Sequence, residues 1–181
     1  MNSNPPNPPT LTTTTYLNDP HVIARISALQ RMPESPDHEH LRLYKRLMSA
    51  ILYCLFPSTA RLSVLQENLT TTLRPSFTIA KLLSKPGGSA HEYDFLLGET
   101  KCPGESWSAS ADQLHAACAA NDNETKNVYG MLQIGFELQF YKHENYRFEA
   151  LGGRLHLVDD VDTVVAWAQH ITANPMPLVH Y

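Results

Sequence analysis

The chain has little cysteine and no excess of positive charge. Its cysteines are odd in number and lack Cys-x-x-Cys spacing; they are Cys54, Cys102 and Cys118. This usage indicates reduced thiols and predicts an intracellular protein, cytoplasmic or nuclear. The formal net charge is −4 at pH 7 and the pI is near 6.1. The chain therefore has no overall positive field that would attract nucleic acid.

A nucleic-acid surface would have to be a local one. The basic residues that cluster are Arg42, Lys45 and Arg46 on one predicted helix, and Lys81 and Lys85 on one predicted strand. Charged residues in such clusters are usually solvated, so both sets are interpreted as solvated faces. Net charge therefore argues against a simple nucleic-acid-binding protein.

Long hydrophobic runs and several common catalytic motifs are also absent. The longest apolar segment, Leu47 to Phe56, is interrupted and shorter than the ~18 residues expected of a membrane span. The N-terminus shows neither the basic region nor the apolar stretch of a secretory signal. The sequence has no His-Glu-x-x-His, glycine-rich phosphate loop or Gly-x-Ser-x-Gly. A membrane protein and the enzymes that carry these motifs are thus disfavoured.

The sequence is expected to form a single domain behind a short tail. Residues 1–17 are rich in Pro and Thr and cannot bury a core. Residues 18–181 have the length and the mixture of apolar and charged residues of one globular domain. Within it, residues 18–75 are predicted to be helical, and residues 76–181 to form a sheet with a C-terminal helix.

Three helices are predicted in the N-terminal part. The first begins at Pro20 and ends near Met32, since proline suits the first helical position. The second is capped by Ser35 and ends before Pro57, and its apolar residues recur at three- and four-residue spacing. The third is expected from Ser58 to Leu73.

Alternating patterns follow from Phe77 onward. The predicted elements are strands at 77–83 and 91–101, a helix capped by Ser108 or Ser110, a long strand at 128–141 with bulges at Gly130 and Gly135, a hairpin of 146–151 and 154–158 across Gly152-Gly153, and a helix after Asp159-Asp160. This order predicts an α/β (α+β) fold with a central mixed sheet flanked by helices.

The most informative strand ends in Glu99-Thr100-Lys101. The carboxylates of Asp94 and Glu99 could hold a divalent cation such as Mg²⁺, which prefers oxygen ligands. Lys101 lies two residues after Glu99, on the same face, where it could orient or deprotonate a water beside the metal. Asp94 and Glu99 are an odd number of residues apart, so they converge only if a bulge intervenes, for example at Gly98. The pattern predicts a phosphodiester-cleaving site.

The sequence around this strand resembles the PD-(D/E)XK nuclease superfamily, and most closely its fungal nuclease-like domains. The likeness covers Thr78 to Tyr141. The matching residues are Asp94, Glu99-Thr100-Lys101, Pro103-Gly104, Trp107 and Ala111-Asp112-Gln113-Leu114. The connection between Asp94 and Glu99 is shorter here than is usual in the superfamily. The resemblance implies a restriction-endonuclease-like αβββαβ core with an N-terminal helical extension.

The resemblance also implies roles for individual residues. Asp94 and Glu99 would bind Mg²⁺, Lys101 would act on the water, and Gln113 would help to position substrate or Lys101. Trp107 is a candidate wall of the cleft. His91 and His115 are further candidates for substrate binding because they lie on the Asp94 strand and the Gln113 helix.

Three functions are consistent with these observations. The first is a Mg²⁺-dependent nuclease. The second is a degenerate fold that binds a partner without catalysis, and the third is an enzyme that acts on a small molecule by acid–base chemistry. A locally positive cleft would favour the nuclease, and a pocket of several hundred cubic ångströms would favour the small-molecule enzyme.

Overall fold

The structure is a computed structural model that describes residues 15–32, 38–66, 75–84 and 87–179. The helices and strands in these ranges are η1 Tyr16–Asn18, α1 Pro20–Arg31, α2 His38–Leu55, η2 Ser58–Ala60, β1 Leu62–Gln66, β2 Phe77–Ser84, β3 Ala90–Lys101, α3 Trp107–Ala119, β4 Val128–Ile134, β5 Glu137–Glu144, β6 Arg147–His156 and α4 Val161–Ala173. Most of the predicted Pro- and Thr-rich tail lies outside the described residues.

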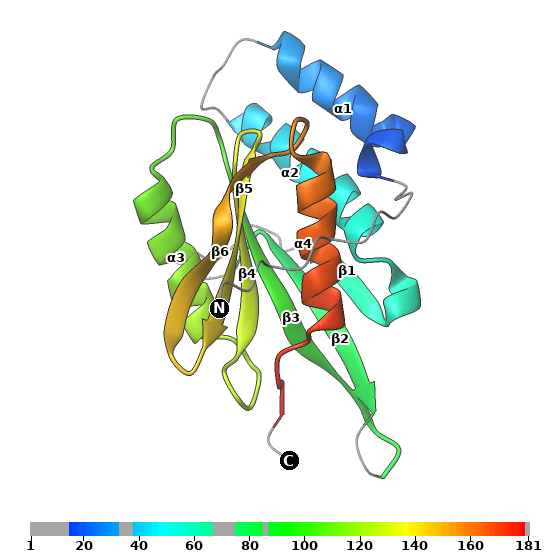
Figure 1. The fold of residues 1–181 in the computed structure, drawn as a ribbon, viewed down its shortest axis with the longest axis vertical. Helices are drawn as coiled ribbons and strands as arrows, with labels where there is room; N and C mark the ends of the chain where they lie inside the picture. Colours follow the sequence, from blue (N-terminus) through cyan, green and yellow to red (C-terminus); the bar gives the residue numbers. More distant parts are fainter. Residues whose placement is uncertain (1–14, 33–37, 67–74, 85–86, 180–181) are drawn as a thin grey trace, which may run out of the picture.

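The strands of the described part form one six-stranded sheet in the order β1-β2-β3-β4-β5-β6 (Figure 1). Neighbouring strands are antiparallel except β3 and β4, which are parallel and are connected through α3. A parallel pair needs a long crossover, and a helix usually supplies it. The predicted mixed sheet with flanking helices is therefore confirmed.

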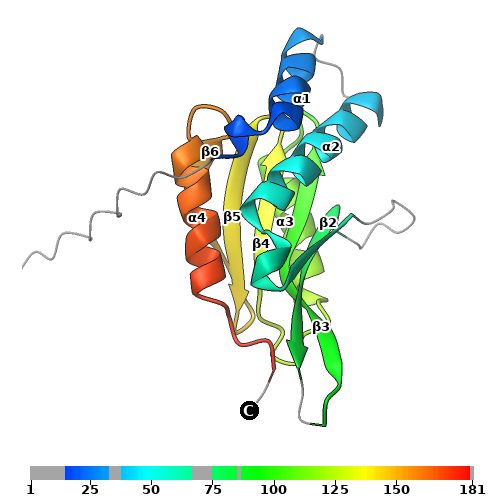
Figure 2. The same ribbon diagram turned by 90° about the vertical axis from the view of Figure 1, so that its right-hand side faces the viewer.

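The helices cover the two faces of the sheet unequally. α2 and α4 lie on one face and α3 on the other, while α1 packs on the outer side of α2 (Figure 2). The larger apolar core lies on the α2 side and includes Leu47, Met48, Phe95 and Phe140. The smaller core lies under α3 and includes Leu97, Leu114, Cys118 and Leu132. Leu96 and Leu97, neighbours on β3, enter different cores as alternation along a strand requires.

Sequence patterns located the first two helices well, and Ser35, the predicted cap of the second, lies outside the described residues. Asp19 caps α1 by accepting hydrogen bonds from the backbone N–H groups of His21 and Val22. The third predicted helix is wrong within the described residues. Residues 58–60 form η2 and residues 62–66 form β1, whose alternate residues Leu62 and Val64 are buried. Pairing with β2 and burial beneath α2 outweigh local helix propensity here.

Four local predictions in the sheet region need correction. The cap of α3 is Ser106, whose Oγ accepts from the N–H of Ala109, and neither Ser108 nor Ser110. The segment 128–141 forms two strands, β4 and β5, because Gly135 takes a positive φ and turns the chain. No bulge lies at Gly130 or Gly135, and the shift in the β5–β6 pairing lies between Leu138 and Phe140.

The predicted hairpin across Gly152-Gly153 is also wrong. β6 is one strand through this region. Gly152 has a φ of +73°, and the pairing with β5 shifts opposite it. A glycine pair in a strand marks a bulge as readily as a turn.

Candidate functional site

Glu99 and Lys101 project from β3 toward α3, as the alternation along the strand predicts. Lys101 Nζ lies 3.0 Å from Glu99 Oε1 and donates a 2.8 Å hydrogen bond to Gln113 Oε1 on α3. Glu99 is 6% exposed, whereas the Lys101 side chain is 22% exposed. The contacts run from the buried carboxylate of Glu99 through the partly exposed Lys101 to Gln113, which is exposed on the helix.

The second oxygen of Glu99 is held by the segment that leads into β2. The backbone N–H of Ser76 donates to Glu99 Oε2 at 3.1 Å. The Oγ of Ser76 accepts from the N–H of Thr100 at 3.3 Å, and Ser76 is itself buried. Both carboxylate oxygens of Glu99 therefore have partners, and the orientation of the carboxylate is fixed.

Lys45 adds a second ammonium group to this site. It lies on α2 and is 4% exposed. Burial lowers the pKa of Lys45; the Glu99 carboxylate raises it in part and the Lys101 ammonium lowers it further. The site thus combines one carboxylate with two lysines.

The interpretation of Lys45 as part of a solvated basic face is wrong. Arg42, one turn earlier, is exposed and pairs with Glu39, but Lys45 faces inward. A signal for this was present in the sequence. Lys45 stands four residues after Leu41 and three before Met48, on the apolar stripe of the helix.

Asp94 lies apart from this group. The β2–β3 pairing shifts so that Ile79 faces Leu96 and Ala80 faces Asp94, which leaves Phe95 unpaired. A bulge therefore occurs, but at Phe95 and not at Gly98. Asp94 is five residues from Glu99, roughly 15 Å at the usual rise of a strand, and its Oδ2 accepts from the N–H of Asp122 at 3.2 Å. It lies beside the end of α3 and the following loop.

The donor set at Glu99 does not fit a protein-bound Mg²⁺. Such an ion needs several oxygen ligands in near-octahedral geometry. Here one carboxylate is present, and an ammonium and an N–H already occupy its oxygens. Over the described ranges, no three His, Cys, Asp or Glu side chains come together in an arrangement that could hold a metal ion.

Of the three predicted substrate-binding residues, His91 and His115 have no contact with Lys101, whereas Trp107 lines a cavity at the end of β3. His91 is exposed near the start of β3, opposite Leu83 and ten residues from Lys101. His115 is on α3 and stacks on Phe148 of β6, with ring centroids 4.9 Å apart. Trp107 begins α3 and lies under the Arg154 guanidinium at 4.3 Å. Only Gln113 of the α3 candidates contacts Lys101.

A cavity of about 690 Å³ lies beyond the carboxyl ends of β3 and β4. Its walls come from the end of α1, from α2, from the β3–α3 connection and from β6. The residues that matter most below are Tyr44, Gly104, Trp107, Phe136, Glu137 and Arg154. Gly135, also in its lining, donates its N–H to the carbonyl of Lys101 at 3.2 Å. The cavity therefore begins where the Glu99–Lys101 strand ends.

Comparison with protein-family models, curated proteins and solved structures finds no match to this chain. Of the helices in the described residues, none has both the length and the apolar character required to cross a membrane.

Proposed function

We propose that this chain binds and cleaves a phosphodiester at Glu99, Lys101 and Gln113 on a PD-(D/E)XK nuclease-like fold. The observation that carries the proposal is the ordered chain of contacts from Ser76 through Glu99 and Lys101 to Gln113. The order of elements from α2 to β4, with β4 parallel to β3, supports it because the resemblance implies the same αβββαβ order.

Each residue has a distinct chemical role in this proposal. Lys101, which is partly exposed, approaches a non-bridging phosphate oxygen and stabilises the charge that develops there. Gln113 and Glu99 hold its ammonium in one position. Glu99 Oε1, which keeps a lone pair besides the one that faces Lys101, accepts a proton from the attacking water, and the leaving oxygen takes a proton from solvent as its bond to phosphorus breaks. Lys45 adds positive charge, which favours an anionic substrate despite the acidic chain.

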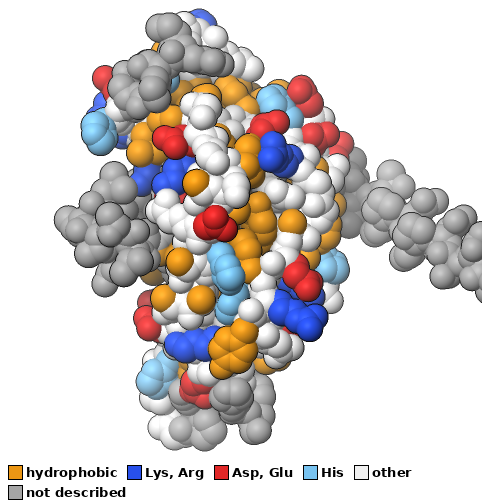
Figure 3. Space-filling view, turned by 90° about the vertical axis from the view of Figure 1, so that its left-hand side faces the viewer, with side chains coloured by type: hydrophobic (Ala, Val, Ile, Leu, Met, Phe, Trp, Pro, Cys, Tyr) orange, Lys and Arg blue, Asp and Glu red, His pale blue; other side chains and the backbone are white. Residues whose placement is uncertain are grey.

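Mg²⁺ has no step in this mechanism. The described residues supply one carboxylate with both oxygens engaged, so they do not offer the ligands that the ion requires. The surface on the α3 side also shows acidic and basic side chains interspersed rather than a basic track (Figure 3). Substrate binding is therefore expected to depend on the local lysines.

A small-molecule phosphate ester is the second candidate substrate. The observation that favours it is the 690 Å³ cavity at the end of β3, because ligand pockets commonly have ~300–1,000 Å³. A degenerate domain that binds the phosphate without hydrolysing it would retain the lysines but show no turnover.

The test is a cleavage assay with single- and double-stranded DNA and RNA, in EDTA and across a Mg²⁺ titration. Lys101→Ala should lower the cleavage rate by roughly a hundredfold or more, as the loss of a positioned catalytic group does. Lys142→Ala is the matched control, since Lys142 also pairs with an acid two residues away on a strand, Glu144. Absence of cleavage by the unaltered chain in every condition would overturn hydrolysis.

A further inference from the structure

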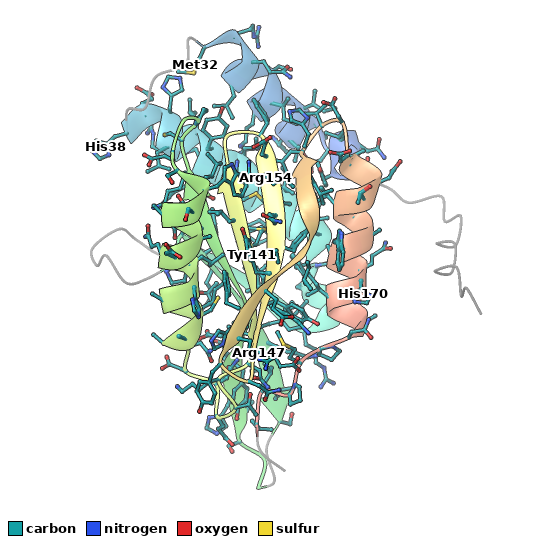
Figure 4. All side chains as sticks on the ribbon, turned by 60° about the vertical axis from the view of Figure 1, so that its left-hand side comes forward. Met32, His38, Tyr141, Arg147, Arg154 and His170 are labelled. Atoms are coloured by element: carbon teal, nitrogen blue, oxygen red, sulfur yellow. The ribbon has the colours of Figure 1, made fainter. Side chains whose placement is uncertain are left out.

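The cavity at the carboxyl ends of β3 and β4 is lined by three aromatic side chains. Tyr44 enters it from α2 and Trp107 from the start of α3, with Phe136 from the β4–β5 turn. Arg154 of β6 adds a guanidinium against the Trp107 ring. Figure 4 shows Arg154 near the upper end of β6, between β6 and α3. Flat apolar rings and a guanidinium plane are surfaces on which a nucleobase stacks.

The charge of the cavity suits a base better than a phosphate. Arg154 is balanced by Glu137, whose carboxylate lies 4.0 Å away, and Glu105 adds another acid to the lining. Gln30 and His156 supply further polar groups. A phosphate would meet two carboxylates here, whereas the edges of a base can accept and donate hydrogen bonds to all these side chains.

The phosphate has a better position close by. Tyr44 lines the cavity, and the next residue on α2, Lys45, is buried and near enough to Glu99 and Lys101 for their charges to shift its pKa. Gly104, in the cavity wall, lies three residues after Lys101. The end of β3 and one turn of α2 thus each contribute a lysine and also lead into a residue that lines the cavity.

From this placement we propose that the cavity binds an unstacked nucleobase, stacked on Trp107 and Arg154, whose attached phosphate lies at Lys101 and Lys45. The inference rests on the proposed function, and it specifies the substrate as a single-stranded nucleic acid or a free nucleotide. A paired duplex cannot place a base there without flipping it out of the stack.

Trp107 allows a direct test. The chain has two tryptophans, so Trp167→Phe leaves Trp107 as the reporter of the cavity. In EDTA, where binding is measured without any requirement for cleavage, the fluorescence of this variant is titrated with AMP, with a single-stranded hexanucleotide and with ribose 5-phosphate. We expect quenching by the base-containing ligands and none by the sugar phosphate.

Affinities of a dye-labelled hexanucleotide complete the test. Trp107→Leu should weaken binding roughly tenfold or more, as the loss of a base-stacking ring does. Arg154→Met should weaken it as well, and it provides a second variant if Trp107→Leu does not fold. Trp167→Phe is the control and should bind normally.

The outcomes distinguish a nucleic-acid strand from a free nucleotide as the ligand, and they test base binding separately from hydrolysis. Hexanucleotide binding much tighter than AMP assigns a nucleic-acid strand, while equal affinities assign a free nucleotide. Equal quenching by ribose 5-phosphate, or no quenching by any ligand, would overturn base recognition. If the chain binds a base but does not cleave any substrate in the assay above, the base-binding site is supported and only the proposed hydrolysis is overturned.

Discussion

Asp94 and Asn123 are joined by two hydrogen bonds between the backbone of one and the side chain of the other. The N–H of Asp94 donates to Asn123 Oδ1 at 3.0 Å, and Asn123 Nδ2 donates to the carbonyl of Asp94 at 2.7 Å. The side-chain amide of Asn123 therefore pairs with the backbone of Asp94 in the way that a peptide group of a neighbouring strand would. This fixes the α3–β4 loop to the middle of β3 at Asp94.

Replacing Asn123 should destabilise the fold without altering the Glu99 site. Its Nδ2 also donates to the carbonyl of Asn127, and the residue is fully buried. Asn123→Ala removes partners from several buried groups, so the free energy of unfolding should fall by about 2–4 kcal/mol. Urea denaturation measures it. The control is Asn174→Ala, whose side chain is exposed and bonds only within its own helix end; an equal loss in both variants would contradict this role.

Neutralising Glu99 should destabilise the protein through the two lysines that remain. Glu99→Gln keeps an oxygen that can accept from the N–H of Ser76, but it leaves Lys45 and Lys101 without a compensating charge. Because Lys101 is partly solvated, we expect a loss of about 2 kcal/mol rather than the larger penalty of a fully buried pair.

A double-mutant cycle with Lys45→Met isolates this effect. If the charges interact as described, Glu99→Gln should cost less in the Lys45→Met background than in the unaltered chain. Strict additivity of the two changes would show that Lys45 and Glu99 do not interact.

Sequence patterns identified the features of the site that depend on the order of nearby residues in the chain. Alternation placed Glu99 and Lys101 on one face, and the resemblance placed Gln113 beside Lys101, as the contacts bear out. Local sequence patterns could not predict the bulge at Phe95, because the bulge follows from the register in which β2 pairs with β3. Ser76 likewise gains a role only when the chain entering β2 meets Glu99.

The same limit applies to the cavity. Its residues come from separate segments, and Tyr44, Phe136 and Arg154 each look ordinary in their own sequence context. Trp107 was named as a candidate wall of a cleft only through the resemblance. Lys45 differs from these residues. Its position on an apolar helical stripe was visible in the sequence, but its net basic neighbourhood suggested a solvated face.

The three cysteines should differ sharply in reactivity. Cys54 is exposed, whereas Cys102 and Cys118 are buried. Burial, with a smaller contribution from the charge of Asp94, raises the pKa of Cys118 to about 12, so its thiolate is scarce at neutral pH. A thiol reagent such as DTNB should label one cysteine in the native state and three in denaturant.

The pKa of Cys54 is itself raised by burial and by Asp19, so its labelling should be slower than that of a free thiol. Cys54→Ser should abolish the native-state reaction. Rapid native labelling that survives in this variant would contradict the buried positions of the other two thiols.

Lys45 should reduce stability while it supports binding. A buried ammonium is costly, and replacing it with an apolar side chain of similar length is often neutral or stabilising. Lys45→Met should therefore raise the free energy of unfolding by about 1 kcal/mol and weaken binding of the phosphate-bearing ligands above. Arg46→Met, one residue along the same helix, is the control and should change neither property appreciably.

The pH dependence of stability gives this prediction a distinctive sign. The native pKa of Lys45 lies below its unfolded value of 10.5, so between these two values the unfolded chain binds more protons and stability rises with pH. The difference in unfolding free energy between Lys45→Met and the unaltered chain should consequently be largest below the native pKa and shrink as pH approaches 10.5. Comparing the two proteins removes the opposing contribution of Tyr16, whose pKa burial raises in both. A difference that stays constant across this range would show that Lys45 is not buried as a charged group.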